Sequence, residues 1–356
     1  MTITRAACVG GGVIGAGWVA RLALNGIDVS IFDPDPEAKR KVGEVMKGAR
    51  RAYRRMATNG LPREGRITYA KSIAEAVEGA DLIQESVPER LDLKHKVLAE
   101  IDAHAQRDAI IGSSTSGIKP TDMQSAMKRP QRLVVAHPFN PVYLLPLVEI
   151  VGGEKTKKKH VERARELYAS IGMKPVVIRK EIEAFVGDRL LEAMWREALW
   201  LIKDGICTVE ELDDIMRYSF GLRWAQMGMF QVYRIAGGEA GMRHFMAQFG
   251  PCLSWPWTKL MDVPEFNDEL VDLIATQSDA QSGQWSIREL EKIRDDNLVA
   301  MMEALARGDG GKGWGAGELH KDYVKQLGKA AKGSKAARKR KAESPANTLE
   351  PKSGKG

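Results

Sequence analysis

A histidine and a glutamate twelve residues apart offer the clearest acid–base chemistry in this sequence. His137 ends the apolar run 133–136, and Glu149 stands inside the apolar run 147–151. A carboxylate in such surroundings needs a partner, because burying it unpaired is costly. A histidine that accepts a proton and a carboxylate that stabilises the imidazolium would satisfy each other. The two residues are therefore a candidate general base and its partner, although an ordinary structural salt bridge would use the same pair.

A glycine-rich segment near the N-terminus has the spacing of a dinucleotide-binding loop. It follows an apolar run, precedes a helical pattern, and is followed by a second apolar run that ends at Asp33. Its residues are Gly10, Gly11, Gly12, Val13, Ile14 and Gly15. The glycines at 10, 12 and 15 permit a tight turn, close approach of a pyrophosphate and close helix packing. Asp33 would accept hydrogen bonds from the ribose hydroxyls and repel a 2′-phosphate, which predicts NAD as the cofactor.

These residues lie in a chain whose first half alternates short apolar runs with amphipathic stretches, as in an α/β sheet. The expected strands are 6–9, 29–32, 81–84, 109–112, 133–136, 147–151 and 175–178. The expected helices between them are 13–25, 37–58, 91–105 and 157–171. After residue 178 the pattern is helical, most clearly at 185–203, 208–217, 264–276 and 286–306. Open α/β sheets bind ligands at the carboxyl ends of their strands, and His137 stands at such an end.

This change of pattern predicts two domains and two C-terminal extensions. Residues 1–182 are expected to form a Rossmann-type NAD-binding domain with a mostly parallel sheet, and residues 183–308 an all-helical domain. A glycine-rich extension at 309–328 and a basic tail at 329–356 follow. The tail has nine lysines and arginines and two glutamates, which accounts for the net charge of +7. Because it has few large apolar side chains, we expect the tail to be disordered. The rest of the chain has no net charge, and we expect it to bind no specific nucleic acid.

Composition argues against several other classes of protein. No apolar run reaches the roughly 18 residues that a membrane-spanning helix needs, so no membrane association is expected. The three cysteines, Cys8, Cys207 and Cys252, are far apart and form no CxxC pattern. This spacing predicts neither a disulfide framework nor a metal site. We therefore expect a cytoplasmic protein without a metal.

Together the motifs resemble those of the 3-hydroxyacyl-CoA dehydrogenase family. They are the glycine loop with Asp33, Glu-Ser-Val-Pro-Glu at 85–89, Ser-Ser-Thr-Ser-Gly at 113–117, and His-Pro-Phe-Asn-Pro at 137–141 with Glu149. The resemblance extends to about residue 305 and implies an NAD-dependent dehydrogenase whose helical domain binds substrate and forms a homodimer.

The resemblance also implies roles for single residues. His137 would be the general base, and Glu149 would orient it. Ser116 would bind the substrate oxygen, and Asn140 would contact the nicotinamide or the substrate. Glu89 and Lys94 match positions that contact the cofactor. A turn or cap residue would also explain Ser116 and Asn140, and a solvated helix lysine would explain Lys94.

One position departs from the acyl-CoA members of the family, which have asparagine where this sequence has Asp188. An acid suits the first turn of a helix, but a carboxylate there also suits a positively charged substrate. The segments 113–120, 137–153, 185–197 and 220–245 are most similar to family members that oxidise L-carnitine. Carnitine has a quaternary ammonium, which aromatic faces and carboxylates bind. Residues 195–285 hold 13 of the 23 aromatic residues. We expect Trp224 to form an aromatic wall of the pocket for the ammonium group. The core or the dimer interface of a helical domain would also explain the aromatic residues.

The expected reaction is the NAD-dependent oxidation of the 3-hydroxyl group of L-carnitine, a small-molecule substrate. A 3-hydroxyacyl-CoA dehydrogenase, or a related 3-hydroxy-acid dehydrogenase, is the first alternative. It is favoured by the basic stretch 39–55, near which acyl-CoA members bind their phosphorylated carrier. The second alternative is a non-catalytic binding protein that retains the fold. The intact set His137, Glu149, Ser116 and Asn140 argues against it.

Overall fold

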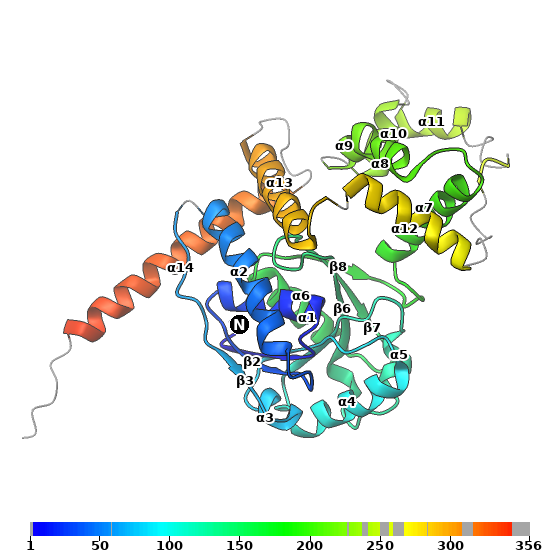
Figure 1. Ribbon diagram of the computed structural model, residues 1–356. Coiled ribbons are helices and arrows are strands. Elements are labelled where there is room, and N and C mark those ends of the chain that lie inside the picture. Colours follow the sequence, from blue (N-terminus) through cyan, green and yellow to red (C-terminus); the bar gives the residue numbers. More distant parts are fainter. Residues whose placement is uncertain are drawn as a thin grey trace, which may run out of the picture.

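The computed structural model describes residues 3–57, 59–225, 228–236, 241–249, 256–258, 267–282, 284–307 and 316–343. At its centre lies an eight-stranded sheet in the order β3-β2-β1-β4-β5-β6-β7-β8 (Figure 1). The strands are β1 Arg5–Val9, β2 Asp28–Phe32, β3 Ile67–Tyr69, β4 Leu82–Glu85, β5 Ile110–Ser113, β6 Leu133–Pro138, β7 Leu147–Gly152 and β8 Lys174–Ile178. This is the mostly parallel Rossmann-type sheet that the sequence predicts.

Two features of the strand order position the candidate residues. The strands run parallel except for the neighbours β6 and β7, which are antiparallel. The chain order reverses between β1 and β4, and such a switch point opens a crevice at the strands' carboxyl ends. The antiparallel β6–β7 pair brings His137 directly opposite Glu149.

Helices cover both faces of the sheet. One face carries α1 Val13–Leu24, α2 Ala38–Met56 and α6 Lys158–Ser170. The other carries α3 Ile73–Val77, α4 Leu91–His104 and α5 Pro120–Gln124. Successive strand residues point to opposite faces, so Val134 packs in the first apolar cluster and Val135 in the second. Burial of both faces explains why the strands read as continuous apolar runs.

After β8, the elements that the structure describes are helices. They are α7 Gly187–Lys203, α8 Val209–Tyr218, α9 Phe220–Trp224, α10 Met229–Ala236, α11 Gly241–Phe249, α12 Asp268–Ser282, α13 Ile287–Arg307 and α14 Gly317–Glu343. Helices α7 to α12 gather to one side of the sheet (Figure 1), and α13 returns to α2. As the sequence predicts, Thr208 and Glu211 form a capping box at the start of α8.

The sequence prediction missed the short elements. All seven predicted strands are present, but β3 was not expected because its three residues are mostly exposed and form no apolar run. The five-residue helix α3 was missed for a similar reason, since it is too short for a helical period. Of the helix predicted at 264–276, the part before residue 267 lies outside the described residues.

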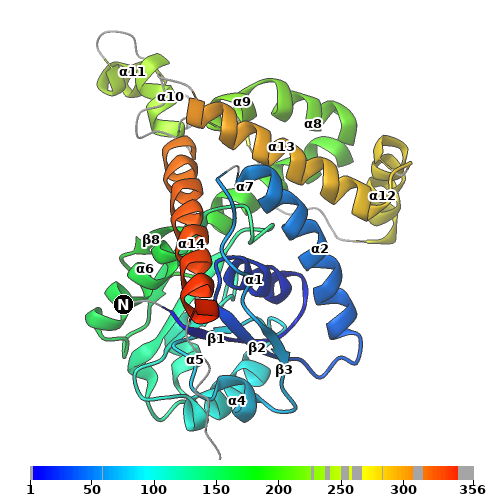
Figure 2. The ribbon, with the colours of Figure 1, turned by 90° about the vertical axis from the view of Figure 1, so that its left-hand side faces the viewer.

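The predicted extensions at 309–328 and 329–356 are wrong for residues 317–343, which form the long helix α14. Tyr323 and Leu327 in its first half are buried in the apolar cluster of the sheet domain. Figure 2 shows α14 passing in front of this domain. The Tyr323 hydroxyl lies 2.8 Å from that of Tyr53 and accepts a hydrogen bond from Asn25 at 2.6 Å. Lysine, alanine and arginine are strong helix formers, and a few buried side chains suffice to dock a helix that composition alone marks as disordered. Residues 344–356 lie outside the described part of the chain.

We expect Leu327→Ala to lower the free energy of unfolding by about 2 to 4 kcal/mol, because it removes a buried side chain from the contact between α14 and the sheet domain. The exposed neighbour Lys329 provides the matched control, and Lys329→Ala is expected to stay within about 0.5 kcal/mol of the unaltered protein. Urea denaturation of the two variants gives both numbers. Equal, small effects would show that α14 does not pack on the domain in solution.

Candidate active site

The glycine loop between β1 and α1 has the conformation that its spacing predicts. Gly10 has a φ of +102°, and a Cβ there would lie 2.5 Å from the carbonyl oxygen of Ser86. A Cβ at Gly15 would lie 1.9 Å from the carbonyl oxygen of Gly10, whereas one at Gly12 would meet nothing within 4 Å. Gly12 therefore leaves space beside the N-terminus of α1, where free N–H groups attract a phosphate.

Asp33 lies at the end of β2 against this loop. Its Oδ2 accepts a hydrogen bond from the Gly11 amide at 2.5 Å, and its Oδ1 accepts one from the Asp35 amide at 2.7 Å. With Val13, Ile14 and other mostly apolar residues, Asp33 lines a cleft of about 630 Å³. An apolar cleft with one anchored carboxylate at its edge fits the adenosine half of NAD.

The candidate base lies at the carboxyl end of β6. His137 Nδ1 lies 2.9 Å from Glu149 Oε2, and both side chains are buried. A carboxylate can only accept hydrogen bonds, so Nδ1 carries the proton and donates it to Glu149. In the neutral ring this leaves the other nitrogen, Nε2, with a free lone pair that can accept a proton. The structure thus brings together the two residues that the sequence singles out.

Glu149 is held as a carboxylate by three donors. Besides His137, the amides of Gly187 and Val186 donate to its Oε1 at 3.0 and 3.2 Å. Burial tends to raise the pKa of Glu149, but these hydrogen bonds and the charge of protonated His137 together lower it below its ordinary value of 4.5. The residue is therefore ionised at neutral pH and can stabilise an imidazolium.

A strained turn before α7 supplies the two amides. Ala184 and Phe185 have φ values of 57° and 48°, in the left-handed region that side chains with a Cβ rarely adopt. Gly187 follows, and a Cβ there would lie 2.4 Å from Cζ of Phe139 and 3.3 Å from Glu149 Oε2. The turn therefore allows the backbone to approach Glu149 as closely as the hydrogen bonds require, and its conformation suggests a functional role.

Asp188, the position where the sequence departs from the acyl-CoA members, lies beside the free nitrogen of His137. Its Oδ2 is 3.6 Å from His137 Nε2. Burial raises the pKa of Asp188, and so do the nearby carboxylates of Glu149, Glu192 and Glu89, while His137 lowers it; the net shift is upward. The surroundings of the base are thus strongly acidic and electrostatically favour a cation.

Ser116 lies on the loop after β5, and Glu89 holds this loop in place. Glu89 Oε1 accepts hydrogen bonds from the Ser116 and Gly117 amides at 3.1 and 3.0 Å and from the Thr115 hydroxyl. The Ala184 amide donates to the Gly117 carbonyl oxygen at 3.3 Å, which ties the loop to the turn before α7. Ser116 itself is exposed next to these anchors.

Lys94 lies beneath that loop, fully buried. Its Nζ donates to Glu85 Oε1 at 2.9 Å and to the Val87 carbonyl oxygen at 3.2 Å, and it lies 3.4 Å from Glu89 Oε2. Lys94 therefore holds Glu85, Val87 and Glu89 together beneath the loop. Glu85 could not be predicted as its main partner, because a carboxylate at the end of β4 has no local feature that distinguishes it from any other strand end.

The two remaining predicted residues are Asn140 and Trp224. Asn140 is exposed three residues after His137 and lines a second cleft, of about 520 Å³, with Val13. Trp224 lies on α9, where its ring packs against Phe220 at a centroid distance of 4.7 Å. Among the described contacts none joins Trp224 to His137, so its part in an aromatic wall stays a prediction.

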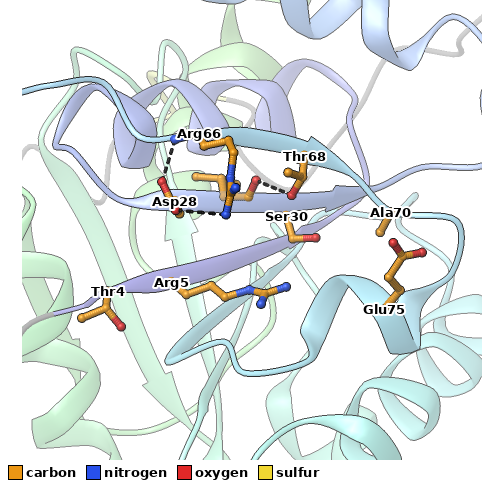
Figure 3. A pocket seen from close by; sticks show the side chains of 9 residues that line it. Thr4, Arg5, Asp28, Ser30, Arg66, Thr68, Ala70 and Glu75 are labelled. Carbon is orange, nitrogen blue, oxygen red and sulfur yellow. Dashed lines mark hydrogen bonds and ion pairs between the residues drawn. The ribbon is translucent and has the colours of Figure 1, made fainter. Parts of the chain in front are cut away.

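Another hollow, at the amino ends of β1, β2 and β3, is separate from this site (Figure 3). Asp28 accepts a hydrogen bond from the Arg66 amide at 2.7 Å and pairs with its guanidinium at 3.6 Å. The glycine loop and His137 lie at the other ends of the strands. Within the described residues no group of three histidine, cysteine or acidic side chains is placed to hold a metal, and no helix is long and apolar enough to cross a membrane.

Comparison with known proteins agrees with this geometry. The NAD-binding domain model of 3-hydroxyacyl-CoA dehydrogenases matches residues 5–182, and the model of their C-terminal domain matches residues 185–263. An L-carnitine dehydrogenase of Mesorhizobium japonicum is 81% identical over 94% of this chain and 92% of its own length. An L-carnitine dehydrogenase/betainyl-CoA thioesterase of Rhizobium meliloti is 67% identical over 92% of this chain, which spans 66% of that longer protein.

A solved structure shares the fold as well. The crystal structure of 5-formyl-3-hydroxy-2-methylpyridine 4-carboxylic acid 5-dehydrogenase, an NAD⁺-dependent dismutase, superposes with a TM-score of 0.72. The two sequences are 30% identical, and the match covers 86% of this chain and all of the other. The similarity therefore extends beyond the sheet into the helical part of the chain.

We expect Glu149→Gln to reduce the loss of folding stability that occurs as the pH falls. Because the pKa of Glu149 is lower in the folded state, its contribution is complete above the ordinary value of 4.5 and is lost as the pH falls below that value. At neutral pH the variant should have a lower free energy of unfolding than the unaltered protein, and this difference should become smaller as the pH falls to about 4. Urea denaturation at both pH values measures it. A difference that does not change with pH would mean that Glu149 is not held as a carboxylate.

Proposed function

This chain belongs to the 3-hydroxyacyl-CoA dehydrogenase family, and on that premise we propose that it oxidises the 3-hydroxyl group of L-carnitine to a ketone with NAD⁺ as the hydride acceptor. Two relatives named as L-carnitine dehydrogenases, at 81% and 67% identity, support this substrate. The observation that carries the proposal is the carboxylate of Asp188, 3.6 Å from the free nitrogen of His137.

The chemistry of the substrate matches this arrangement. In carnitine a single methylene separates the carbinol carbon from the trimethylammonium group. When His137 Nε2 receives the hydroxyl proton, the ammonium must therefore lie close to the imidazole, where Asp188 stands. A quaternary ammonium donates no hydrogen bonds, so a nearby carboxylate attracts it by charge alone. The neighbouring carboxylates that raise the pKa of Asp188 add to this attraction.

The proposed mechanism assigns the proton to His137. Its Nε2 removes the hydroxyl proton of the substrate, and Glu149 stabilises the resulting imidazolium through Nδ1. When bound, NAD⁺ supplies the nicotinamide carbon that accepts the hydride. Gly12 and the N-terminus of α1 would hold the pyrophosphate, and Asp33 the adenosine ribose. Ser116 and Asn140 would position the substrate oxygen, and Glu89 and Lys94 would keep the Ser116 loop in place.

We also propose that the helical part of the chain joins a second copy. Large apolar side chains are exposed there, as expected of a surface that a partner covers. They include Leu190, Leu191, Trp195, Ile215, Tyr218, Leu222, Phe230 and Trp257. Such a homodimer would cover part of the aromatic-rich segment 195–285.

A cytoplasmic location completes the proposal. It is supported by Cys8 and Cys207, which are free thiols, because free thiols persist in a reducing compartment. The proposed cofactor is also a metabolite of that compartment.

The reaction is tested by NADH formation with L-carnitine, D-carnitine and a 3-hydroxyacyl-CoA supplied side by side. We expect turnover with L-carnitine and little with the acyl-CoA ester. His137→Gln should reduce kcat by about 10² to 10⁴, the usual contribution of a positioned general base. NADH binding, followed by its fluorescence, should stay close to normal, since His137 is not part of the glycine loop. Comparable turnover in this variant would rule out His137 as the base.

Asp188→Asn tests recognition of the cation. At a separation of ~5 Å and an effective dielectric constant of ~20, the charge attraction is about 3 kcal/mol before desolvation. A net loss of about 1 kcal/mol, several-fold in KM for L-carnitine, is therefore expected. The matched substrate is 3-hydroxy-5,5-dimethylhexanoate, in which carbon replaces the ammonium nitrogen.

Asp188 also contacts His137, so any effect on the base would appear equally with both substrates. Only a loss confined to the charged substrate counts as cation recognition. If Asp188→Asn changes KM for both substrates by the same factor, the cation binds elsewhere.

A further inference from the structure

The loop that joins β6 to β7 carries Asn140 at its start and is held from two sides. Its own backbone is compact, because the Leu144 and Leu145 amides both donate to the Pro141 carbonyl oxygen at 2.9 Å. Such internal bonds shape the loop but do not attach it to the sheet domain. Contacts from outside must do so, and they determine where the exposed amide of Asn140 lies.

Arg21 of α1 makes the first contact. This buried side chain donates from Nε to the Val142 carbonyl oxygen at 2.7 Å and from a terminal nitrogen to the Leu145 carbonyl oxygen at 3.1 Å. The side chain of Val142 packs on Gly17, where a Cβ would lie 2.9 Å from it. The body of the loop is thereby attached to the same helix whose N-terminus faces the proposed pyrophosphate site.

Asp295 of α13 makes the second contact, through Tyr143. The Tyr143 hydroxyl donates to Asp295 Oδ2 at 2.6 Å, and Arg294 donates to Asp295 Oδ1 at 2.9 Å. Both Tyr143 and Asp295 are buried. Burial and the neighbouring carboxylate raise the pKa of Tyr143, which keeps its hydroxyl protonated and able to donate. The two residues are 152 positions apart in the sequence.

Ion pairs other than that of the buried acid also dock α13 on the sheet domain. On the exposed side of the contact with α2, Asp296 pairs with Arg51 and, at 3.1 Å, with Arg55. Arg288 pairs with Glu44 at 2.7 Å. A buried carboxylate costs more than these exposed pairs and gains little net stability from its partners. Its presence at position 295 therefore calls for a role other than attaching α13.

We propose that Asp295 is a positioning residue of the active site, which holds Tyr143 and thereby sets the orientation of Asn140. Asn140, Tyr143 and Asp295 line the same 520 Å³ cleft as Val13 of the glycine loop. The inference rests on the proposed function, in which Asn140 contacts the substrate oxygen or the nicotinamide. Helix α13 thus contributes to the reaction geometry without touching the reactants.

The test compares Tyr143→Phe, Asp295→Leu and the double variant. A displacement of about 1 Å can cost up to about a hundredfold in rate, so each single variant should lower kcat with L-carnitine at least about tenfold. KM for NAD⁺ should change much less than kcat, because neither Asp33 nor the glycines at 10, 12 and 15 line this cleft. The double variant should be no slower than the slower single variant, since both changes break one contact.

Two further variants separate positioning from stability. Asp295→Asn retains an oxygen that can accept from Tyr143 and should recover most of the lost kcat. Asp296→Asn on the same helix removes only the exposed pairs with α2 and should leave kcat unchanged. The melting temperature of each variant is measured together with its kcat, so that a loss of stability is recognised as such.

The outcomes distinguish this inference from the proposed function. If the unaltered enzyme does not oxidise L-carnitine, the proposed function is wrong. If it does, two results would show that Asp295 does not position Asn140. Either Tyr143→Phe and Asp295→Leu keep full kcat, or the losses of kcat in the two single variants multiply in the double variant. A fall in melting temperature without a fall in kcat would assign Asp295 to stability alone.

Discussion

The hydrogen bond between His137 and Glu149 is the interaction on which the rest of the site depends. The antiparallel register of β6 and β7 makes the two residues neighbours, and burial makes each require the other. Because Glu149 can only accept, it selects the imidazole tautomer whose free nitrogen faces Asp188. The strained turn before α7 adds two amide donors to Glu149, so the start of the helical part of the chain also helps to hold the partner of His137.

The acidic surroundings of His137 distinguish this site from one built for a neutral substrate. Glu149, Asp188 and Glu89 contribute negative charge at this site, and burial, together with repulsion from the other carboxylates, raises the pKa of Asp188. An unpaired carboxylate in a partly buried place is unfavourable unless a cation binds beside it. The negative charge at this site therefore favours a substrate with a quaternary ammonium. Relatives at 81% and 67% identity are named for such a substrate.

Local pattern was enough to predict the sheet, the glycine loop with Asp33 and the pairing of His137 with Glu149, because each leaves a mark within a short stretch of sequence. Contacts between distant segments left no such mark. Nothing local indicates that Tyr143 meets Asp295, or that the turn at Ala184 and Phe185 bends towards Glu149. Composition was misleading for α14, since a basic, alanine-rich stretch resembles a disordered tail until Tyr323 and Leu327 are seen packed on the domain. Lys94 was expected to contact the cofactor, with a solvated helix lysine as the alternative; its side chain is instead buried against Glu85, which excludes that alternative.

The proposed reaction requires that Glu149 hold His137 in the tautomer protonated on Nδ1. Long-range ¹H–¹⁵N correlation spectra of protein labelled at its six histidines report this directly, with His137→Gln identifying the signal. In the neutral ring we expect a protonated Nδ1 and an unprotonated Nε2 for His137, and loss of this preference in Glu149→Gln. A His137 ring protonated on Nε2 would rule out this role of Glu149, because the nitrogen facing Asp188 could then not accept the substrate proton.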